Sequence, residues 1–370
     1  MTVFDLASKC FPLNISSGNL SNLLACCCSR LERVLYRVSY DTDPLHRPNE
    51  RMVAASAFSF PRLIELDMGG ARIEVETLRD LLINNPNIRI FKCGLMTLYE
   101  FPNDVICEKL ETVVVSMCQS EFIRTLVRQH PHIKHLGIIY WNGRVREPAQ
   151  HVLNGILGSV PNLKSLELRT NSTSLYRYSF LEMDKLWQLR SLQSLCLRCG
   201  WIDDFVLEMI AKNLKGLESF ELRSHQRLLS DRGIGCLSAL PNLRKLIIHQ
   251  CPSSTATLGE EVKPLALRGR LRMVEFGDAS TPDLTAAFIK HCPELEHFNL
   301  HKVHGVESAD EAAKFVQSLS GFPQTRLKIR VNAVMNMWHF WEADEVKRAL
   351  EEVNKTAKSR VLTIQVPGMD

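Results

Sequence analysis

The chain has 370 residues, and 45% of them are hydrophobic, enough to bury a large core. Its 45 Lys and Arg against 41 Asp and Glu leave a formal net charge of +4, without the basic block of a dedicated nucleic-acid binder. No apolar run reaches the ~20 residues that span a bilayer, and Met1 to Asp5 lacks the regions of a secretory signal. We therefore expect a cytoplasmic or nuclear protein with no membrane or nucleic-acid partner.

The first stretch of the chain is apolar and is followed by a polar one. Leu20 to Leu31 has the composition of an apolar helix and contains Cys26-Cys27-Cys28. Neighbouring residues of one element point in different directions, so these thiols do not form a natural metal cage. Palmitoylation of the cluster is the other interpretation. Residues 37–57 are polar and predict a long loop.

From residue 58 onward a short phrase recurs, a turn residue, often Pro, followed by Leu-x-x-Leu-x-Leu. Alternate leucines of this phrase point to one face of a short strand, and helical spacing follows it. Weaker copies lie at 31–35, 327–329 and 361–364. The first apolar residues of successive strong copies are 22 to 30 residues apart: Leu63, Ile88, Leu110, Ile133, Leu163, Leu192, Leu217, Leu243, Leu271 and Leu295.

Such a repeat determines the fold class, because a strand with one helix cannot bury its apolar face alone. Stacked copies share a core between a parallel sheet and a row of helices. We predict an α/β solenoid, a curved horseshoe of about ten to thirteen irregular repeats with the strands on its inner, concave face. Residues 1–57 form an N-terminal cap and first weak repeat, 58–332 the solenoid, and 333–370 a C-terminal helix and strand cap. Residues 251–270 are a candidate insertion.

Two helices illustrate the expected packing. In Asp204 to Lys212 the predicted buried stripe is Phe205, Val206, Met209 and Ile210. The C-terminal segment Ala333 to Ala357 is predicted to be one helix that covers the end of the core. Its expected buried side chains are Trp338, Trp341, Val346, Ala349, Leu350 and Val353. Trp338 to Trp341 could instead be a hot spot for a partner.

The phrase resembles the leucine-rich repeat superfamily over most of the chain. Three copies carry the longer pattern that ends in Cys or Asn, namely 110–118, 163–171 and 243–251. Leu195 to Asp204 is similar to the cysteine-containing repeat of F-box leucine-rich proteins. The resemblance implies a substrate-binding subunit of an SCF (cullin-type) ubiquitin ligase, whose F-box docks the ligase adaptor. Residues 4–35 offer only Phe11-Pro12-Leu13 of an F-box, so that module is missing, diverged or never present.

The twelve cysteines favour a reducing compartment. Cys118, Cys199 and Cys251 stand where the repeat places a small buried side chain, and a buried thiol behaves as a small hydrophobe.

No catalytic motif is present, and we expect no catalytic residue, cofactor or metal. There is no Gly-x-Ser-x-Gly, phosphate-binding loop or His-Glu-x-x-His. His130-Pro131-His132 resembles a metal-binding motif, but Ile133 directly after it is the first apolar residue of a repeat copy. Zinc needs about four convergent ligands, so we expect these histidines to belong to the repeat. His297 and His301 share a strand face but are too far apart for one ion without partners.

Aligned repeats predict two ladders of polar side chains on the strand face. The residue after the second strand leucine is Arg169, Arg198, Arg223, His249 or His301, and Gly277 interrupts this column. The position two residues earlier holds Glu167, Cys196, Glu221, Ile247, Glu275 and Asn299. The candidate partner-binding residues are Glu167, Arg169, Arg198, Glu221, Arg223, Lys245, His249, Glu275, His297, Asn299 and His301.

The ladders admit two interpretations. Arg side chains bind carboxylate and phosphate well, which favours an acidic or phosphorylated protein partner on the concave face. Alternatively, Glu and Arg pair along the sheet and only keep this face soluble. We expect a non-enzymatic recognition scaffold. The alternative to the ligase subunit is a protein of the ribonuclease-inhibitor type that acts as an inhibitor, scaffold or small-GTPase regulator.

Overall fold

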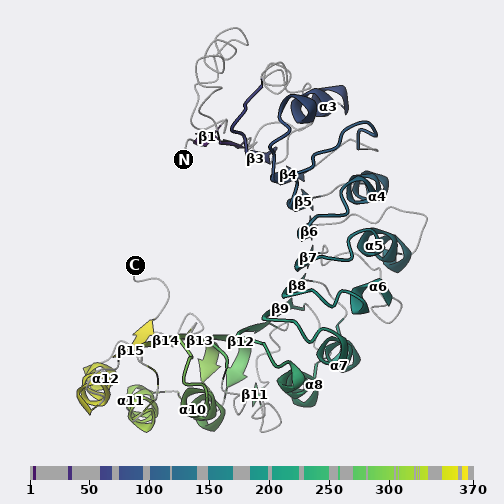
Figure 1. Cartoon of the computed structure of the whole chain (residues 1–370). Coiled ribbons are helices and arrows are strands. Elements are labelled where there is room, and N and C mark those ends of the chain that lie inside the picture. The colour runs from purple at the N-terminus through teal and green to yellow at the C-terminus, as the bar shows by residue number, and fades with distance from the viewer. Residues whose placement is uncertain are drawn as a thin grey trace, which may run out of the picture. The chain divides into compact units, whose positions relative to one another are not determined.

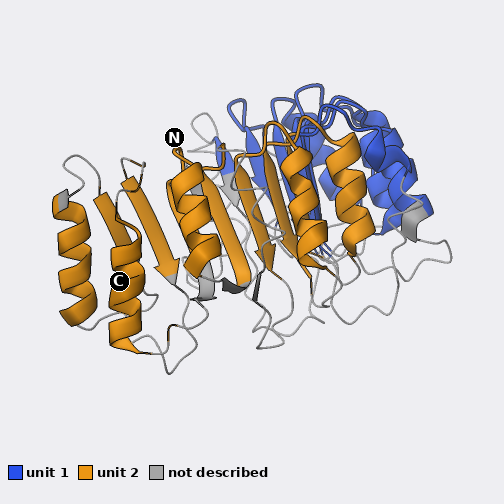
Figure 2. Ribbon diagram, turned by 90° about the horizontal axis from the view of Figure 1, so that it is seen from below, with its two compact units in different colours: residues 1–192 blue, residues 193–370 orange. Residues whose placement is uncertain are grey.

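The protein forms two compact units, residues 1–192 and 193–370 (Figure 2). The predicted division at residues 57 and 332 stays a prediction. The computed structural model describes residues 3–5, 32–35, 59–68, 75–94, 101–116, 119–139, 149–169, 184–198, 202–224, 229–249, 257–258, 270–280, 282–303, 306, 308–320, 322, 324, 326–331, 344–356 and 361–365.

The first unit is a parallel sheet with helices on one side (Figure 1). Its strands pair in chain order: β1 Val3–Asp5, β2 Arg33–Leu35, β3 Glu65–Asp67, β4 Ile90–Gly94, β5 Thr112–Ser116, β6 His135–Ile139 and β7 Ser165–Arg169. Its helices are α3 Val75–Asn84, α4 Ser120–Gln129, α5 Ala149–Gly158 and the short α6 Asp184–Trp187.

The second unit repeats this arrangement. Its strands are β8 Ser194–Arg198, β9 Ser219–Arg223, β10 Lys245–His249, β12 Met273–Ser280, β13 His297–Val303, β14 Arg326–Val331 and β15 Val361–Gln365, with β11 Thr257–Leu258 beside β12. Its helices are α7 Asp204–Asn213, α8 Asp231–Cys236, the 3₁₀ turn η3 Leu237–Ala239, α10 Pro282–His291, α11 Ala309–Ser318 and α12 Asp344–Thr356.

The repeated leucines form the core between each sheet and its helices. In β8, Leu195 and Leu197 are fully buried, while Ser194, Cys196 and Arg198 between and beside them are half-buried. This alternation recurs in β5, β7 and β9. In the second unit, Phe276, Phe288 and Phe298 form an aromatic cluster with ring centroids 5.6–6.4 Å apart. Burial of such side chains, worth roughly 1.5–3 kcal/mol each, is what holds strand and helix together.

Buried polar side chains join successive repeats of the first unit. The Asn85 side chain accepts a hydrogen bond from Phe60 N at 2.7 Å and donates to Leu81 O at 2.7 Å. His130 stands at the equivalent place, since each of the two is followed by Pro-x-Ile. Its Nδ1 contacts Leu126 O at 2.8 Å, and Cys107 N donates to its Nε2 at 3.0 Å. Burial is the main cause that lowers the pKa of His130. His130 therefore has a structural role.

Two predicted helices differ from the observed ones. In α7 the buried side chains are Val206, Leu207, Ile210 and Ala211. Phe205, predicted to be buried, is 47% exposed, and Met209 is half-buried. The side chain of Asp203 caps the helix by accepting from Val206 N at 3.1 Å, and the stripe lies one residue further along than periodicity alone suggested.

The C-terminal helix is described only from Asp344 to Thr356. It buries Val346, Ala349 and Val353 as predicted, while Leu350 is half-buried. Trp338 and Trp341 lie outside the described residues, as do the predicted helix 20–31 with its three cysteines, and Cys118, Cys199 and Cys251. Within the predicted insertion 251–270, the two residues of β11 pair with β12.

Candidate partner-binding face

The strand face, the face of each sheet that the helices do not cover, carries the polar residues of the repeat. In the second unit, parallel pairing sets Arg198, Arg223 and His249 side by side on β8, β9 and β10. Cys196, Glu221, Ile247, Glu275 and Asn299 form the row two residues earlier. The observed register is the one that the repeat alignment predicts for these strands.

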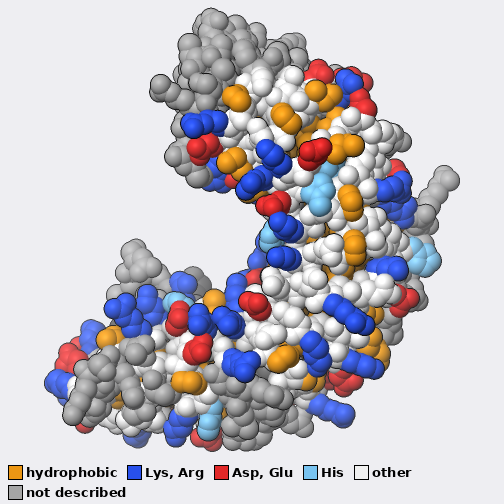
Figure 3. Space-filling model, viewed as in Figure 1, with side chains coloured by type: hydrophobic (Ala, Val, Ile, Leu, Met, Phe, Trp, Pro, Cys, Tyr) orange, Lys and Arg blue, Asp and Glu red, His pale blue; other side chains and the backbone are white. Residues whose placement is uncertain are grey.

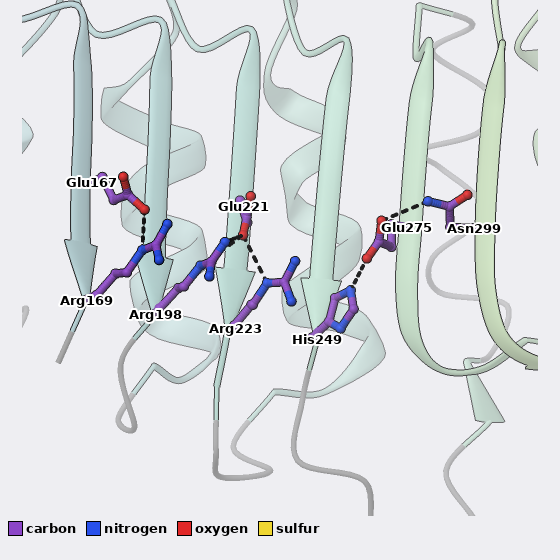
Figure 4. A network of polar contacts seen from close by, with 8 residues as sticks. All are labelled: Glu167, Arg169, Arg198, Glu221, Arg223, His249, Glu275 and Asn299. Carbon is purple, nitrogen blue, oxygen red and sulfur yellow. Dashed lines mark hydrogen bonds and ion pairs between the residues drawn. The ribbon is translucent and has the colours of Figure 1, made fainter. Parts of the chain in front are cut away.

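One carboxylate in this face holds two guanidinium groups. Arg198 donates to Glu221 Oε1 from Nη2 at 2.7 Å and from Nε at 3.1 Å (Figure 4). Arg223 donates to the same oxygen from Nε at 3.0 Å. Burial raises the pKa of Glu221, but the hydrogen bonds and charges of Arg223 and Arg198 outweigh it, and its pKa lies below the ordinary value. The three residues carry one net positive charge.

A second cluster joins β10, β12 and β13. His249 Nε2 lies 2.5 Å from Glu275 Oε1, and Asn299 Nδ2 donates to Glu275 Oε2 at 2.9 Å (Figure 4). The hydrogen bond with His249 is the main cause that lowers the pKa of Glu275 to about 2. Glu275 is thus an anion throughout the physiological range, and it holds His249 and Asn299 in place.

Gly277 interrupts the basic column for a steric reason. A Cβ on Gly277 would lie 3.0 Å from His249 Cα and 3.1 Å from its Cγ. The register between β12 and β13 also shifts between Phe276 and Ala279. The empty side-chain position leaves room for the imidazole that Glu275 holds.

The strand face of the first unit contains comparable ion pairs. Glu167 pairs with Arg169 on the same strand. Glu65, only 3% exposed, pairs with Arg33 of β2 and with Lys92 of β4, the latter at 2.7 Å. Each unit therefore shows the pairing of Glu with basic residues that was the second interpretation of the ladders.

The remaining predicted residues lie on the same face of the second unit without joining these clusters. Lys245 begins β10 and is half-buried, and His297 begins β13 and is exposed. His301 lies on β13, but its side chain is outside the described set.

Sequence reasoning missed the most basic strand. In β14, Arg326, Lys328 and Arg330 are exposed, while Leu327 and Ile329 between them are buried. The signal was the alternation Arg-Leu-Lys-Ile-Arg. The aligned ladders end with the copy that begins at Leu295, and the weaker copy at 327–329 lacks the leucine phrase that would extend them. Figure 3 shows Lys and Arg side chains gathered on the strand side of this unit, with carboxylates among them.

The strand face of the second unit offers charged side chains that can take part in ionic contacts. Apart from the half-buried Lys245, the basic groups described above are held by carboxylates or are exposed, and such groups can bind carboxylate or phosphate. Among the described residues, no group of three or more His, Cys, Asp and Glu could hold a metal ion. The part of the chain that the structure describes contains no helix long and apolar enough to cross a membrane.

Stacked strand-and-helix repeats with buried leucines at equivalent positions define the fold of each unit as a leucine-rich repeat solenoid. No known family model matches the sequence. Internalin C2 from Listeria monocytogenes is similar, with a TM-score of 0.34 and 18% identity over 61% of this chain and 82% of that one. A chain of the yeast Rad7 and Elc1 complex has a TM-score of 0.46 and 16% identity over 87% of this chain and 86% of that one.

Proposed function

We propose that the protein is a non-enzymatic recognition scaffold that binds an acidic protein partner on the strand face of its second unit. Arg198 and Arg223 carry the proposal, because two guanidinium groups from adjacent strands share one carboxylate and retain a net positive charge. A parallel sheet with both neighbours paired is a rigid support, so these groups are already oriented before a partner arrives.

The finer proposal is that the chain is the substrate-binding subunit of an SCF (cullin-type) ubiquitin ligase. The cysteine-containing repeat at Leu195 to Asp204 supports it, because that repeat resembles those of F-box leucine-rich proteins. In such an assembly the strand face selects the substrate and a separate module docks the ligase adaptor.

Affinity purification of the full chain tests both the recognition scaffold and the finer proposal of a ligase subunit. The ligase proposal expects a cullin and its adaptor together with a substrate. Recovery of a small GTPase or a ribonuclease without a cullin would favour the inhibitor or regulator alternative, which the repeat architecture equally supports.

The strand face itself is tested by replacing Arg198 and Arg223 with Gln. We expect the recovered partner to bind roughly five- to thirtyfold more weakly, because two charged contacts worth roughly 0.5–1 kcal/mol each are lost. The matched control is Lys212→Gln with Lys290→Gln, which removes two positive charges from exposed positions on helices α7 and α10. Unchanged binding by the Arg variant, with the partner still captured, would exclude this face as the contact.

A further inference from the structure

We propose that β14 is a docking strip for an extended acidic protein segment whose carboxylate side chains occur at every second residue. The inference rests on the proposed recognition function and specifies the partner's chemistry. The strip consists of Arg326, Lys328 and Arg330, which the clusters around Glu221 and Glu275 do not include.

The first observation is that all three side chains face away from the core. Leu327 and Ile329 are buried with 0% exposure, and the three basic residues that alternate with them are exposed. Side chains of one strand face are two residues apart, about 6.6 Å along the strand. β14 therefore presents three positive charges in a straight line.

The second observation is that no carboxylate among the described residues pairs with the strip. By register, Lys328 stands beside His297 of β13 and Thr363 of β15, and Arg330 stands beside Asn299 and Gln365. None of these neighbours is acidic. Within the described residues, none of the three cations forms an ion pair, in contrast to Arg198, Arg223 and His249.

Like charges on one strand face repel one another, so this arrangement costs stability in the isolated protein. The repulsion becomes an attraction once an anionic ligand lies on the strip. Glu296 precedes β13, and its backbone oxygen accepts a hydrogen bond from Lys328 N at 2.9 Å, but within the described residues its carboxylate forms no ion pair with the strip. Glu275 on β12 is already held by His249 and Asn299. The strip is thus set up for an external anion.

The geometry selects the form of that anion. β14 is hydrogen-bonded to β13 on one side and to β15 on the other, so its backbone cannot accept an added strand. Recognition must come from side chains on the face. An extended peptide has the same period of about 6.6 Å between alternate side chains, so carboxylates at every second residue match the three cations one to one.

A protein segment fits better than a nucleic acid. Single strands are bound by basic grooves that also offer aromatic side chains for base stacking. The described residues that pair with β14 across the face are His297, Asn299, Val361 and Thr363, and apart from the imidazole they provide no ring. The modest net charge of +4 also favours a protein ligand over a nucleic acid.

The test uses the full chain and two labelled peptides of one composition, measured by fluorescence anisotropy. One peptide alternates Glu with Thr, and its isomer carries the Glu residues in one block. We expect the alternating peptide to bind more tightly, and Arg326→Gln with Lys328→Gln and Arg330→Gln to weaken it at least tenfold, since three exposed ion pairs are lost. The matched control is Lys290→Gln with Lys314→Gln and Lys355→Gln, three exposed cations on helices α10, α11 and α12.

The outcomes separate this inference from the proposed function. Equal affinity for the two peptides, or no effect of the β14 substitutions, would overturn the strip, even if the Arg198 and Arg223 variant still loses its partner. Tighter binding of an oligothymidylate than of the alternating peptide would overturn the choice of a protein ligand. Loss of binding in the helix control would show that total charge, not the strip, is responsible.

Discussion

At the scale of single residues, the strand face of the second unit contains two kinds of basic group. Arg198 and Arg223 are fixed by a carboxylate that lies between them, and His249 is fixed by another. Fixed groups lose little conformational freedom when a partner binds, which favours specificity. The cations of β14 lack such partners among the described residues and are suited to long-range attraction of an acidic segment.

Glu275 makes the stability of the second unit sensitive to acid. Its pKa is about 2 in the folded protein, against an ordinary value of 4.5. The unfolded chain takes up the proton first, so this stabilisation is present above pH 4.5 and is lost as the pH falls from 4.5 toward 2. For a partly solvated group we expect it to be worth about 1–2 kcal/mol.

Glu275→Gln should therefore lower the free energy of unfolding at neutral pH and flatten its decline below pH 4.5, as measured by urea unfolding at a series of pH values. Glu218→Gln, a substitution of an exposed carboxylate on the same unit, is the control. If the free energy of unfolding of the Glu275 variant declined below pH 4.5 as steeply as that of the unsubstituted protein, Glu275 would not be the source of the acid sensitivity.

At the scale of elements, one contact joins the helices of two successive repeats. Asp204, the first residue of α7, accepts hydrogen bonds from Ser230 N at 2.8 Å and from Ser230 Oγ at 2.6 Å. Ser230 in turn caps α8 by accepting from Gly233 N at 3.3 Å. A Cβ on Gly233 would lie 2.0 Å from Asp204 Oδ1, so this glycine is required by the close approach of the carboxylate.

The contact between Asp204 and Gly233 predicts that substitutions at the two residues do not add in their effects on the free energy of unfolding. Asp204→Ala should cost about 1–2 kcal/mol of unfolding free energy through the lost hydrogen bonds. Gly233→Ala should also destabilise the protein because of the overlap with the carboxylate. In the double variant most of that overlap is gone, so the second substitution should cost clearly less than it does alone. Additive losses in chemical denaturation would show that the two residues do not meet.

At the scale of the whole molecule, each of the two compact units is a series of similar repeats whose strands pair with their neighbours in sequence. In such a solenoid, stability is approximately a sum over repeats and their interfaces. Within each unit the buried side chains of the described residues are spread along successive repeats, so a local defect should stay local.

Phe298→Ala tests this expectation in the aromatic cluster of the second unit. Removal of a fully buried Phe costs about 3–5 kcal/mol. Hydrogen exchange should accelerate in β12, β13 and β14, while β4, β5 and β6 of the first unit keep their protection. Exposed Phe205→Ala in the same unit is the control. Equal acceleration in both units would mean that the chain unfolds as one cooperative body.

The repeat predicted much of the fold. The buried leucines of β7, β8 and β9 and the register of Arg198, Arg223 and His249 follow from the spacing of the phrase, because equivalent residues in stacked repeats must lie side by side. The phase of α7 did not follow, since the cap at Asp203 sets where the helix begins and periodicity alone does not locate it.

The amino-acid sequence by itself thus determined the class of fold and the rows of residues on the strand face, because both depend only on a short period that repeats along the chain. Only the tertiary structure decided which charges neutralise each other. Whether Glu221 also reaches the guanidinium group of Arg198, and whether Arg326, Lys328 and Arg330 find a counter-ion, depends on contacts between side chains of different strands. Arg223 is only two residues from Glu221 on β9, but Arg198 reaches the same carboxylate from 23 positions away on β8, and no local pattern specifies that contact.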